Sequence, residues 1–147
     1  MENIKQIMQE NEAALHAFRV FMRASTTINR HEGRVIKQHQ LTLSQFAVME
    51  VLYNKGNMRI QDLIEKLQAT SGNITVIIRN MIRDGYIFKT CHPSDKRAFL
   101  IGLTPLGRET IERVLPEHYA NIGQIFSVLT EEEQNQLANM MKKFKNL

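Results

Sequence analysis

The amino-acid sequence predicts an α+β fold that is mainly helical and contains one small β-hairpin. Apolar residues recur at helical spacing through most of the chain. Two short segments rich in β-branched and aromatic residues, 86–92 and 98–103, are separated by the turn-forming and charged stretch Pro-Ser-Asp-Lys-Arg. Two short helical segments directly precede this hairpin. Helix, turn, helix and hairpin in this order predict a winged helix-turn-helix, here flanked by long N-terminal and C-terminal helices.

Length and composition limit the class of protein. The 147 residues suit a single domain, 1–147, with one core. A net charge of +4 and a pI near 9.4 favour a polyanionic partner such as nucleic acid. Cys91 is the one cysteine, so no intrachain disulfide can form and the reducing cytoplasm is the expected compartment. The polar start of the chain is unlike a signal peptide, and no apolar run approaches the ~20 residues that cross a membrane.

Residues 3–38 carry the pattern of one long helix. Their apolar residues fall on a broad stripe that extends from Ile4 to Ile28. A helix of this length has more apolar face than one small domain covers, which indicates a partner chain. Residues 41–103 are the expected winged part, and residues 1–40 and 104–147 are the helical part that flanks it.

Two short helices come next. Thr42 and Gln45 fit the N-cap and N3 positions of a capping box, and apolar residues beside this box fit a hydrophobic staple. The helix that follows is expected to end at 54–57, a polar stretch that contains a glycine. Apolar residues at i, i+3, i+4 and i+7 predict another helix over about 60–67.

The fourth helix is expected to begin with Thr70 or Ser71 as its cap and to end at Gly85. At about 100° per residue, the apolar residues share one side of this helix; they are Ile74, Ile77, Ile78, Met81 and Ile82. The other side carries Gly72, Asn73, Val76, Arg79, Asn80 and Arg83, with Thr75 at the boundary. We expect the apolar side to pack against the two preceding helices.

The polar side of the fourth helix has chemistry suited to DNA. Arginine can bind guanine, asparagine can bind adenine, and serine or threonine can reach bases or phosphates. The small residues Ser71 and Gly72 let backbone N–H groups approach a phosphate. A solvated helix face is the alternative, and the preceding short helix and the following basic hairpin favour DNA. Asp95, Lys96 and Arg97 form the expected hairpin tip, which is either an ordinary charged turn or a wing that contacts the backbone or minor groove.

Two further helices complete the pattern. Thr104 and Pro105 fit the N-cap and N1 positions of the first of them. Thr130 and Glu133 fit a second capping box. Pro116 falls in the middle of the first apolar pattern, so a kink or a break is expected there.

These segments resemble the MarR family of bacterial transcription regulators. Residues 70–87 stand in the place of the family's recognition helix, 92–107 match its wing signature and the Leu-Thr-x-x-Gly helix start, and 129–137 match its final helix. The resemblance implies a triangular homodimer whose interface is formed by the first helix and the last two, so that residues 1–40 and 104–147 form the dimerisation part and residues 41–103 form the DNA-binding part. It also implies a two-fold-symmetric site on double-stranded DNA, bound most commonly by a repressor that a small phenolic or lipophilic ligand releases. Such a regulator would act in the bacterial cytoplasm, at the nucleoid.

The resemblance also implies roles for single residues. The expected major-groove contacts are Ser71, Asn73, Thr75 and Arg79. Arg97 would enter the minor groove, with Asp95 as its orienting partner. The expected contacts to the DNA backbone are Arg83, Lys89 and Lys96, with Arg59 as a further candidate.

Other kinds of site lack their motifs. The neighbouring residues Cys91 and His92 would point to opposite faces of a strand, so a nucleophile–base pair is not expected. Cys91 is then either a structural strand residue or an exposed thiol able to form an intersubunit disulfide. Glu12 and His16 share the i, i+4 spacing that a zinc site can use, without further ligands at metal-binding spacing.

The sequence therefore predicts neither an enzyme nor a cofactor-binding protein. A winged-helix module for protein–protein contact is the alternative from another functional class. A metal-responsive or thiol-responsive regulator of the same fold is a further alternative. The thiol-oxidising branch of the family carries a cysteine early in the first helix, and residues 15–25 of this chain contain none.

Overall fold

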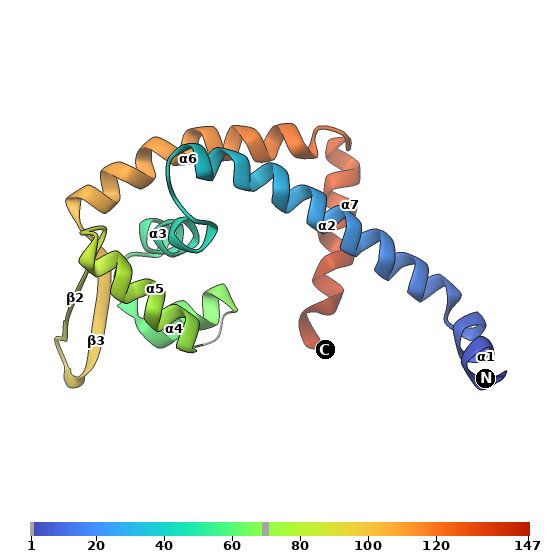
Figure 1. Ribbon diagram of the computed structural model, residues 1–147, viewed down its shortest axis with the longest axis horizontal. Helices are drawn as coiled ribbons and strands as arrows, with labels where there is room; N and C mark the ends of the chain where they lie inside the picture. Colours follow the sequence, from blue (N-terminus) through green and yellow to red (C-terminus); the bar gives the residue numbers. More distant parts are fainter. Residues whose placement is uncertain (1, 69–70) are drawn as a thin grey trace.

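The computed structural model of the chain describes residues 2–68 and 71–147, and Figure 1 shows how its elements lie in space. The described part is mainly helical and holds one small antiparallel sheet, which confirms the predicted fold class. In chain order its elements are α1 (Glu2–Glu10), α2 (Glu12–Gln38), α3 (Leu43–Lys55), β1 (Met58–Arg59), α4 (Ile60–Leu67), α5 (Ser71–Arg83), β2 (Ile87–His92), β3 (Asp95–Leu103), α6 (Pro105–Phe126), α7 (Glu131–Lys142) and the 3₁₀ helix η1 (Lys143–Asn146).

The N-terminal segment forms two helices rather than the single helix expected over residues 3–38. α1 ends at Glu10 and α2 begins at Glu12, because Asn11 leaves the helical path with φ −113° and ψ 16°. The side-chain Nδ2 of Asn11 donates a hydrogen bond of 2.9 Å to the carbonyl of Ile7. Asparagine side chains compete with the backbone for such bonds, which favours helix ends over helix interiors.

Threonine caps begin α3, α6 and α7, as the sequence predicts. Thr42 Oγ1 accepts from the N–H of Gln45 at 3.1 Å, and Gln45 Oε1 accepts from the N–H of Thr42 at 3.0 Å. Thr130 and Glu133 form the same reciprocal pair at 3.2 and 2.8 Å. At α6, Thr104 Oγ1 accepts from a backbone N–H one turn into the helix, at 3.0 Å. Each cap satisfies a backbone donor that the helix start leaves unpaired.

Pro116 does not break α6. The helix runs from Pro105 to Phe126 as one element, and Figure 1 shows it bending along its length. A proline removes one backbone donor, here the partner of the carbonyl of Glu112. Glu112 is exposed, so water can take the place of this donor. The expected break is therefore wrong, and the bend fits the expected kink.

The sheet contains a strand that the sequence patterns did not reveal. Its strand order is β1-β3-β2, with both pairs antiparallel. β1 has only two residues, and Met58 and Arg59 pair with Ile101 and Leu100 of β3. A two-residue segment is too short to show a periodic pattern, so only its pairing with β3 identifies it as a strand.

The turn of the hairpin lies earlier than expected. β2 ends at His92 and β3 begins at Asp95, so Asp95, Lys96 and Arg97 are strand residues next to the turn. The Nδ1 atom of His92 accepts from the backbone N–H of Ser94 at 3.1 Å. Asp95 Oδ1 accepts from the backbone N–H of Arg97 at 3.0 Å. These two side chains shape the turn, which is a contribution that a residue-type pattern does not predict.

One hydrophobic core joins the winged part to the helical part. Its buried residues come from the end of α2, from α3, α4 and α5, from all three strands, and from the first half of α6. Both staple residues beside the first capping box, Leu41 and Phe46, are buried in it. Figure 1 shows α2 and α6 running side by side above the winged part, while α7 turns down from the far end of α6.

A second set of apolar side chains is exposed in this chain. It lies on α1, α2, the second half of α6, α7 and η1, and includes Ile4, Ile7, Met8, Phe18, Val20, Phe21, Met22, Tyr119, Met140 and Phe144. None of the described helices combines the length and the apolar character that a membrane crossing requires.

Candidate nucleic-acid interface

The helix α5 has two chemically different faces. Ile74, Ile78 and Met81 are 2%, 3% and 0% exposed, so they dock the helix on the core. Ile77 is half-buried and packs against the same core. Ile82 was expected on this side, but it is 37% exposed, because it lies at the edge of the apolar side, three positions after the exposed Arg79. The structure thus confirms the apolar side of α5, although its stripe of buried residues is narrower than the sequence predicts.

The opposite face, here called the polar face of α5, is open to solvent. Within it, Gly72, Asn73, Thr75, Val76, Arg79 and Arg83 are exposed and Asn80 is half-buried. Ser71 begins the helix, but its side chain lies outside the described part of the structure. Thr70, the alternative cap, lies wholly outside the described residues. Gln68 ends α4 in a left-handed conformation with φ 50°.

The two arginines of the polar face differ in their surroundings. Arg83 Nε lies 3.1 Å from Asp84 Oδ1, and both side chains are well exposed. Exposed pairs of this kind are typically worth less than about 1 kcal/mol, so Arg83 can still exchange Asp84 for a phosphate. No ion pair to Arg79 is present among the described residues. Its guanidinium is therefore available to a partner that lies in front of α5.

The hairpin holds the other predicted cations. Lys96 and Arg97 are exposed beside the turn, and Lys89 is exposed on β2. The Nζ atom of Lys89 lies 4.2 Å from the centroid of the Phe99 ring, which fixes the ammonium over one face of the sheet. Asp95 was expected to orient the Arg97 side chain, and its observed bond goes to the Arg97 backbone instead. Asp95 thus fixes where β3 begins and leaves the guanidinium of Arg97 unrestrained by that bond.

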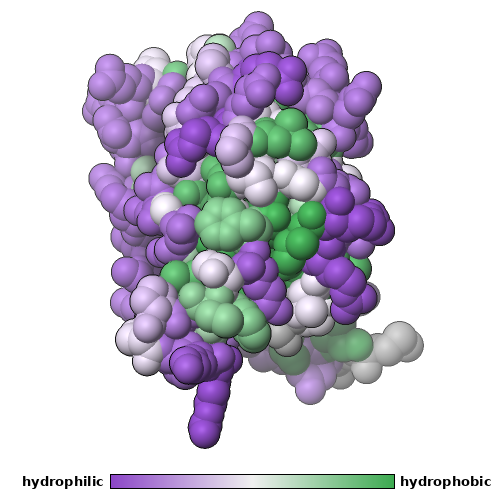
Figure 2. Space-filling view, turned by 90° about the vertical axis from the view of Figure 1, so that its left-hand side faces the viewer, coloured by the Kyte–Doolittle hydropathy of each residue, from purple (hydrophilic) through white to green (hydrophobic). Residues whose placement is uncertain are grey.

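The polar face of α5 and the hairpin lie at the same end of the molecule. α5 packs against β2, and Figure 1 places both next to β3, away from the chain ends. Figure 2 shows this end from the hairpin side: it is largely hydrophilic, with a hydrophobic patch near its centre and a hydrophilic projection at its lower edge. Arg59, the further candidate, is exposed on β1 at the other edge of the sheet.

Cys91, Glu12 and His16 are the residues behind the alternative predictions of a thiol-responsive or metal-responsive regulator. Cys91 is exposed, which argues against a buried structural role for this thiol. The strand register shifts between Cys91 and His92, and the ring nitrogen of His92 is occupied by Ser94. Glu12 and His16 are exposed on α2, and the described residues contain no group of three or more metal-ligating side chains.

A buried histidine was not singled out by the sequence patterns. His118 of α6 is 5% exposed, and its ring centroid lies 4.5 Å from that of Phe46 in α3. Its Nδ1 atom is buried and has no hydrogen-bond partner among the described residues. The preceding residue, Glu117, accepts a 3.1 Å contact from His39 at the end of α2. Only the packing of α2, α3 and α6 brings these residues together, so no local pattern could have predicted them.

Comparison with known proteins identifies the family. The sequence model of the MarR family matches residues 41–99, which is the winged part as far as the middle of β3. The HTH-type transcriptional regulator YkoM of Bacillus subtilis is 36% identical over 135 residues, which cover 92% of this chain and 88% of YkoM. The chain belongs to the MarR family. It is therefore a MarR-family transcriptional regulator, as the resemblance of its segments indicates.

Solved structures of MarR-family proteins share the fold. A cysteine-to-serine mutant of MarR from E. coli, in complex with operator DNA, aligns with a TM-score of 0.82 at 22% identity, covering 90% of this chain and 95% of that one. BpsR of Bordetella bronchiseptica, whose DNA binding is regulated by 6-hydroxynicotinic acid, aligns with a TM-score of 0.80 at 21% identity, covering 88% and 92%. At these identities, the agreement concerns the backbone arrangement alone.

Proposed function

We propose that this MarR-family chain is a homodimeric repressor that binds a two-fold-symmetric DNA site and is released by a small ligand. One observation carries this proposal: the helix after the turn keeps an exposed polar and cationic face beside a hairpin that carries further cations. A helix needs only one face for docking, so the second face is available for recognition. Such a regulator acts in the bacterial cytoplasm, at the nucleoid.

In the proposed complex, α5 lies in the major groove and the hairpin lies along the adjacent backbone. Ser71, Asn73, Thr75 and Arg79 face the base edges, where arginine suits guanine and asparagine suits adenine. Gly72 supports this position, because the absence of a side chain lets the start of the helix approach a phosphate. Phosphate contacts come from Arg83, Lys89 and Lys96. Arg97 enters the minor groove, where narrow A·T-rich segments attract arginine.

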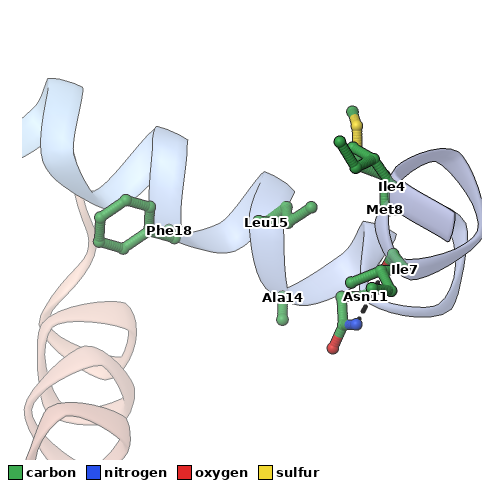
Figure 3. A pocket seen from close by; sticks show the side chains of 7 residues that line it. All are labelled: Ile4, Ile7, Met8, Asn11, Ala14, Leu15 and Phe18. Carbon is green, nitrogen blue, oxygen red and sulfur yellow. Dashed lines mark hydrogen bonds between the residues drawn. The ribbon is translucent and has the colours of Figure 1, made fainter. Parts of the chain in front are cut away.

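The dimer is supported by the exposed apolar side chains of the helical part, residues 1–40 and 104–147. The chain bends between α1 and α2 at Asn11, and Figure 3 shows the side chains that line the hollow beside this bend. The hollow has a volume of about 490 Å³ and is lined almost entirely by apolar side chains: Ile4, Ile7, Met8, Ala14, Leu15 and Phe18, together with Asn11. Burying one large apolar side chain is worth about 1.5–3 kcal/mol, so a second copy that covers several of them gains a stable interface.

Charge also suits contact between two copies. The start of the chain is acidic, with Glu10 and Glu12 close to the apolar hollow, whereas the other end carries Lys142, Lys143 and Lys145. Opposite charges at the two ends of the helical part favour an arrangement in which the first helices of one copy meet the last helix of the other.

The proposed ligand would act between the helical part and the winged part. BpsR supports a small ring compound as ligand, and in this chain His118 offers a suitable contact. It lies where α6 meets α3, and its buried Nδ1 has no hydrogen-bond partner among the described residues. A ligand hydroxyl that donates to this nitrogen would satisfy a group that is otherwise buried at a free-energy cost.

The proposed function is tested by fluorescence anisotropy with the DNA that lies upstream of the protein's own gene. Binding should weaken steeply with salt, because each neutralised phosphate adds about −0.9 to the log–log slope. The variant Arg79→Ala should relax the preference between base sequences, whereas Lys96→Ala should weaken all sequences about equally. A protein that remains dimeric and binds no DNA at low salt would overturn the proposal and favour a protein–protein module.

A further inference from the structure

One side chain on the polar face of α5 is apolar, and none of the contacts proposed above uses it. Val76 is 49% exposed, whereas Ile74 and Ile78 on the docking side are 2% and 3% exposed. Residues three and four positions apart are neighbours on a helix surface. None of the four such neighbours of Val76 is apolar: they are Gly72, Asn73, Arg79 and Asn80. Val76 is thus an isolated apolar side chain within a polar surface, and it contributes little to the docking of α5 on the core.

The space next to Val76 is open. A Cβ atom built on Gly72 would meet no heavy atom within 4 Å among the described residues. Side chains on a helix lean toward its N-terminus, so the methyl groups of Val76 lean over the space that Gly72 leaves free. Valine is β-branched and has one strongly preferred χ1 rotamer in a helix, so its methyl groups lose little freedom on binding. Val76 therefore presents a rigid apolar surface to any group that approaches the start of α5.

We propose that Val76 recognises thymine through the C5-methyl group that this base displays in the major groove. The inference rests on the proposed binding of α5 in that groove. Of the four bases, only thymine presents a methyl group there, and cytosine carries only a hydrogen at the same C5 position. Asn73 and Arg79 on either side suit the hydrogen-bonding edges of purines. Val76 adds the apolar contact that these hydrogen-bonding side chains cannot make, and so it selects thymine between the bases that they contact.

The test replaces single thymines of the bound DNA by deoxyuridine, which lacks only the C5-methyl group. An operator is first selected from random DNA with the full-length protein. Each thymine is then replaced in turn, symmetrically in both half-sites, and dissociation constants are measured by fluorescence anisotropy at one fixed salt concentration. Parent protein, Val76→Ala and Ile82→Val are compared. Ile82→Val is the matched control, because it also shortens an exposed aliphatic side chain of α5, at a position outside the polar face.

For the parent protein, one thymine position per half-site should be sensitive to loss of the methyl group. The expected loss of affinity is about fourfold per half-site, the ratio that corresponds to burying one methylene-sized group. Val76→Ala should abolish the sensitivity at this position alone, while Ile82→Val keeps the parent profile. Alanine has the higher helix propensity, so the substitution should not unfold α5, and a thermal melt checks this.

Two results would overturn the role of Val76: a parent protein that tolerates deoxyuridine at every thymine, or a Val76→Ala variant that keeps the parent's sensitivity. Both leave operator binding intact, so they refute this inference without refuting the proposed function. Failure to select any operator would instead refute the proposed function, and the inference would fall with it.

Discussion

The junction between the hairpin and α6 allows a sharp prediction, because Gly107 has no room for a side chain. A Cβ atom on Gly107 would lie 1.9 Å from the carbonyl oxygen of Tyr86, where ordinary contacts are 3.4–4 Å. The same carbonyl accepts a 3.1 Å hydrogen bond from the N–H of Thr104, the N-cap of α6. The substitution Gly107→Ala must therefore move backbone atoms, and it breaks this bond as it does so.

The expected change in the free energy of unfolding is the sum of two destabilising contributions and one stabilising contribution. Overpacking a filled site lowers stability by about 1–3 kcal/mol, here at the upper end because the opposing atom belongs to the backbone. Loss of the hydrogen bond removes about 1 kcal/mol, and the better helix propensity of alanine returns about 1 kcal/mol. The free energy of unfolding should thus fall by about 3 kcal/mol.

Gly33 of α2 is the matched control. It is also a buried helical glycine, but its Cβ would meet only Leu43 side-chain atoms at 3.8 Å, an ordinary contact. Gly33→Ala should therefore raise the free energy of unfolding by up to about 1 kcal/mol. Urea unfolding followed by circular dichroism, at one fixed protein concentration, measures both variants. Equal stability of the two variants would refute the assignment of Gly107 as a close-contact glycine.

Further predictions concern caps, faces and the interface. Thr42→Ala should lower the free energy of unfolding by about 1 kcal/mol in the same urea assay, because the capping bond to Gln45 is lost. Ile78→Ala should lower it by about 2–5 kcal/mol, whereas Arg79→Ala should change it by less than about 0.5 kcal/mol. Lys96→Ala should reduce the magnitude of the log–log salt slope of DNA binding by about 2, one phosphate for each copy in the dimer. Phe18→Glu should shift sedimentation toward a monomer, because it places a charge in the apolar hollow.

Features set by local bonds were predictable from the sequence. The starts of α3, α6 and α7 are fixed by threonine side chains that bond within three residues, so residue type and spacing suffice to predict them. The two faces of α5 follow equally from helical periodicity. The candidate DNA contacts that the sequence suggested on α5 are indeed exposed where their side chains are described, although their roles in binding remain predictions.

Features set by distant partners were not predictable. β1 is a strand only because β3 pairs with Met58 and Arg59. The position of the hairpin turn depends on the side chains of His92 and Asp95, which bond to the backbone of the turn and move its tip away from Lys96. The sequence pattern shows that Val76 is isolated among polar residues, but only its exposure in the fold distinguishes it from the isoleucines that dock the same helix.

The division of α5 into two faces separates folding from recognition in physical terms. Ile78 and Arg79 are adjacent in sequence, yet the first is buried in the core and the second has no ion pair among the described residues. A surface substitution away from packed or bonded features usually changes the free energy of unfolding by less than about 0.5 kcal/mol. Changes on the polar face can therefore alter the preferred DNA sequence while the core, and with it the position of α5, stays fixed. The docking pattern of isoleucine and methionine thus leaves the residues of the polar face free to determine which DNA sequence is bound.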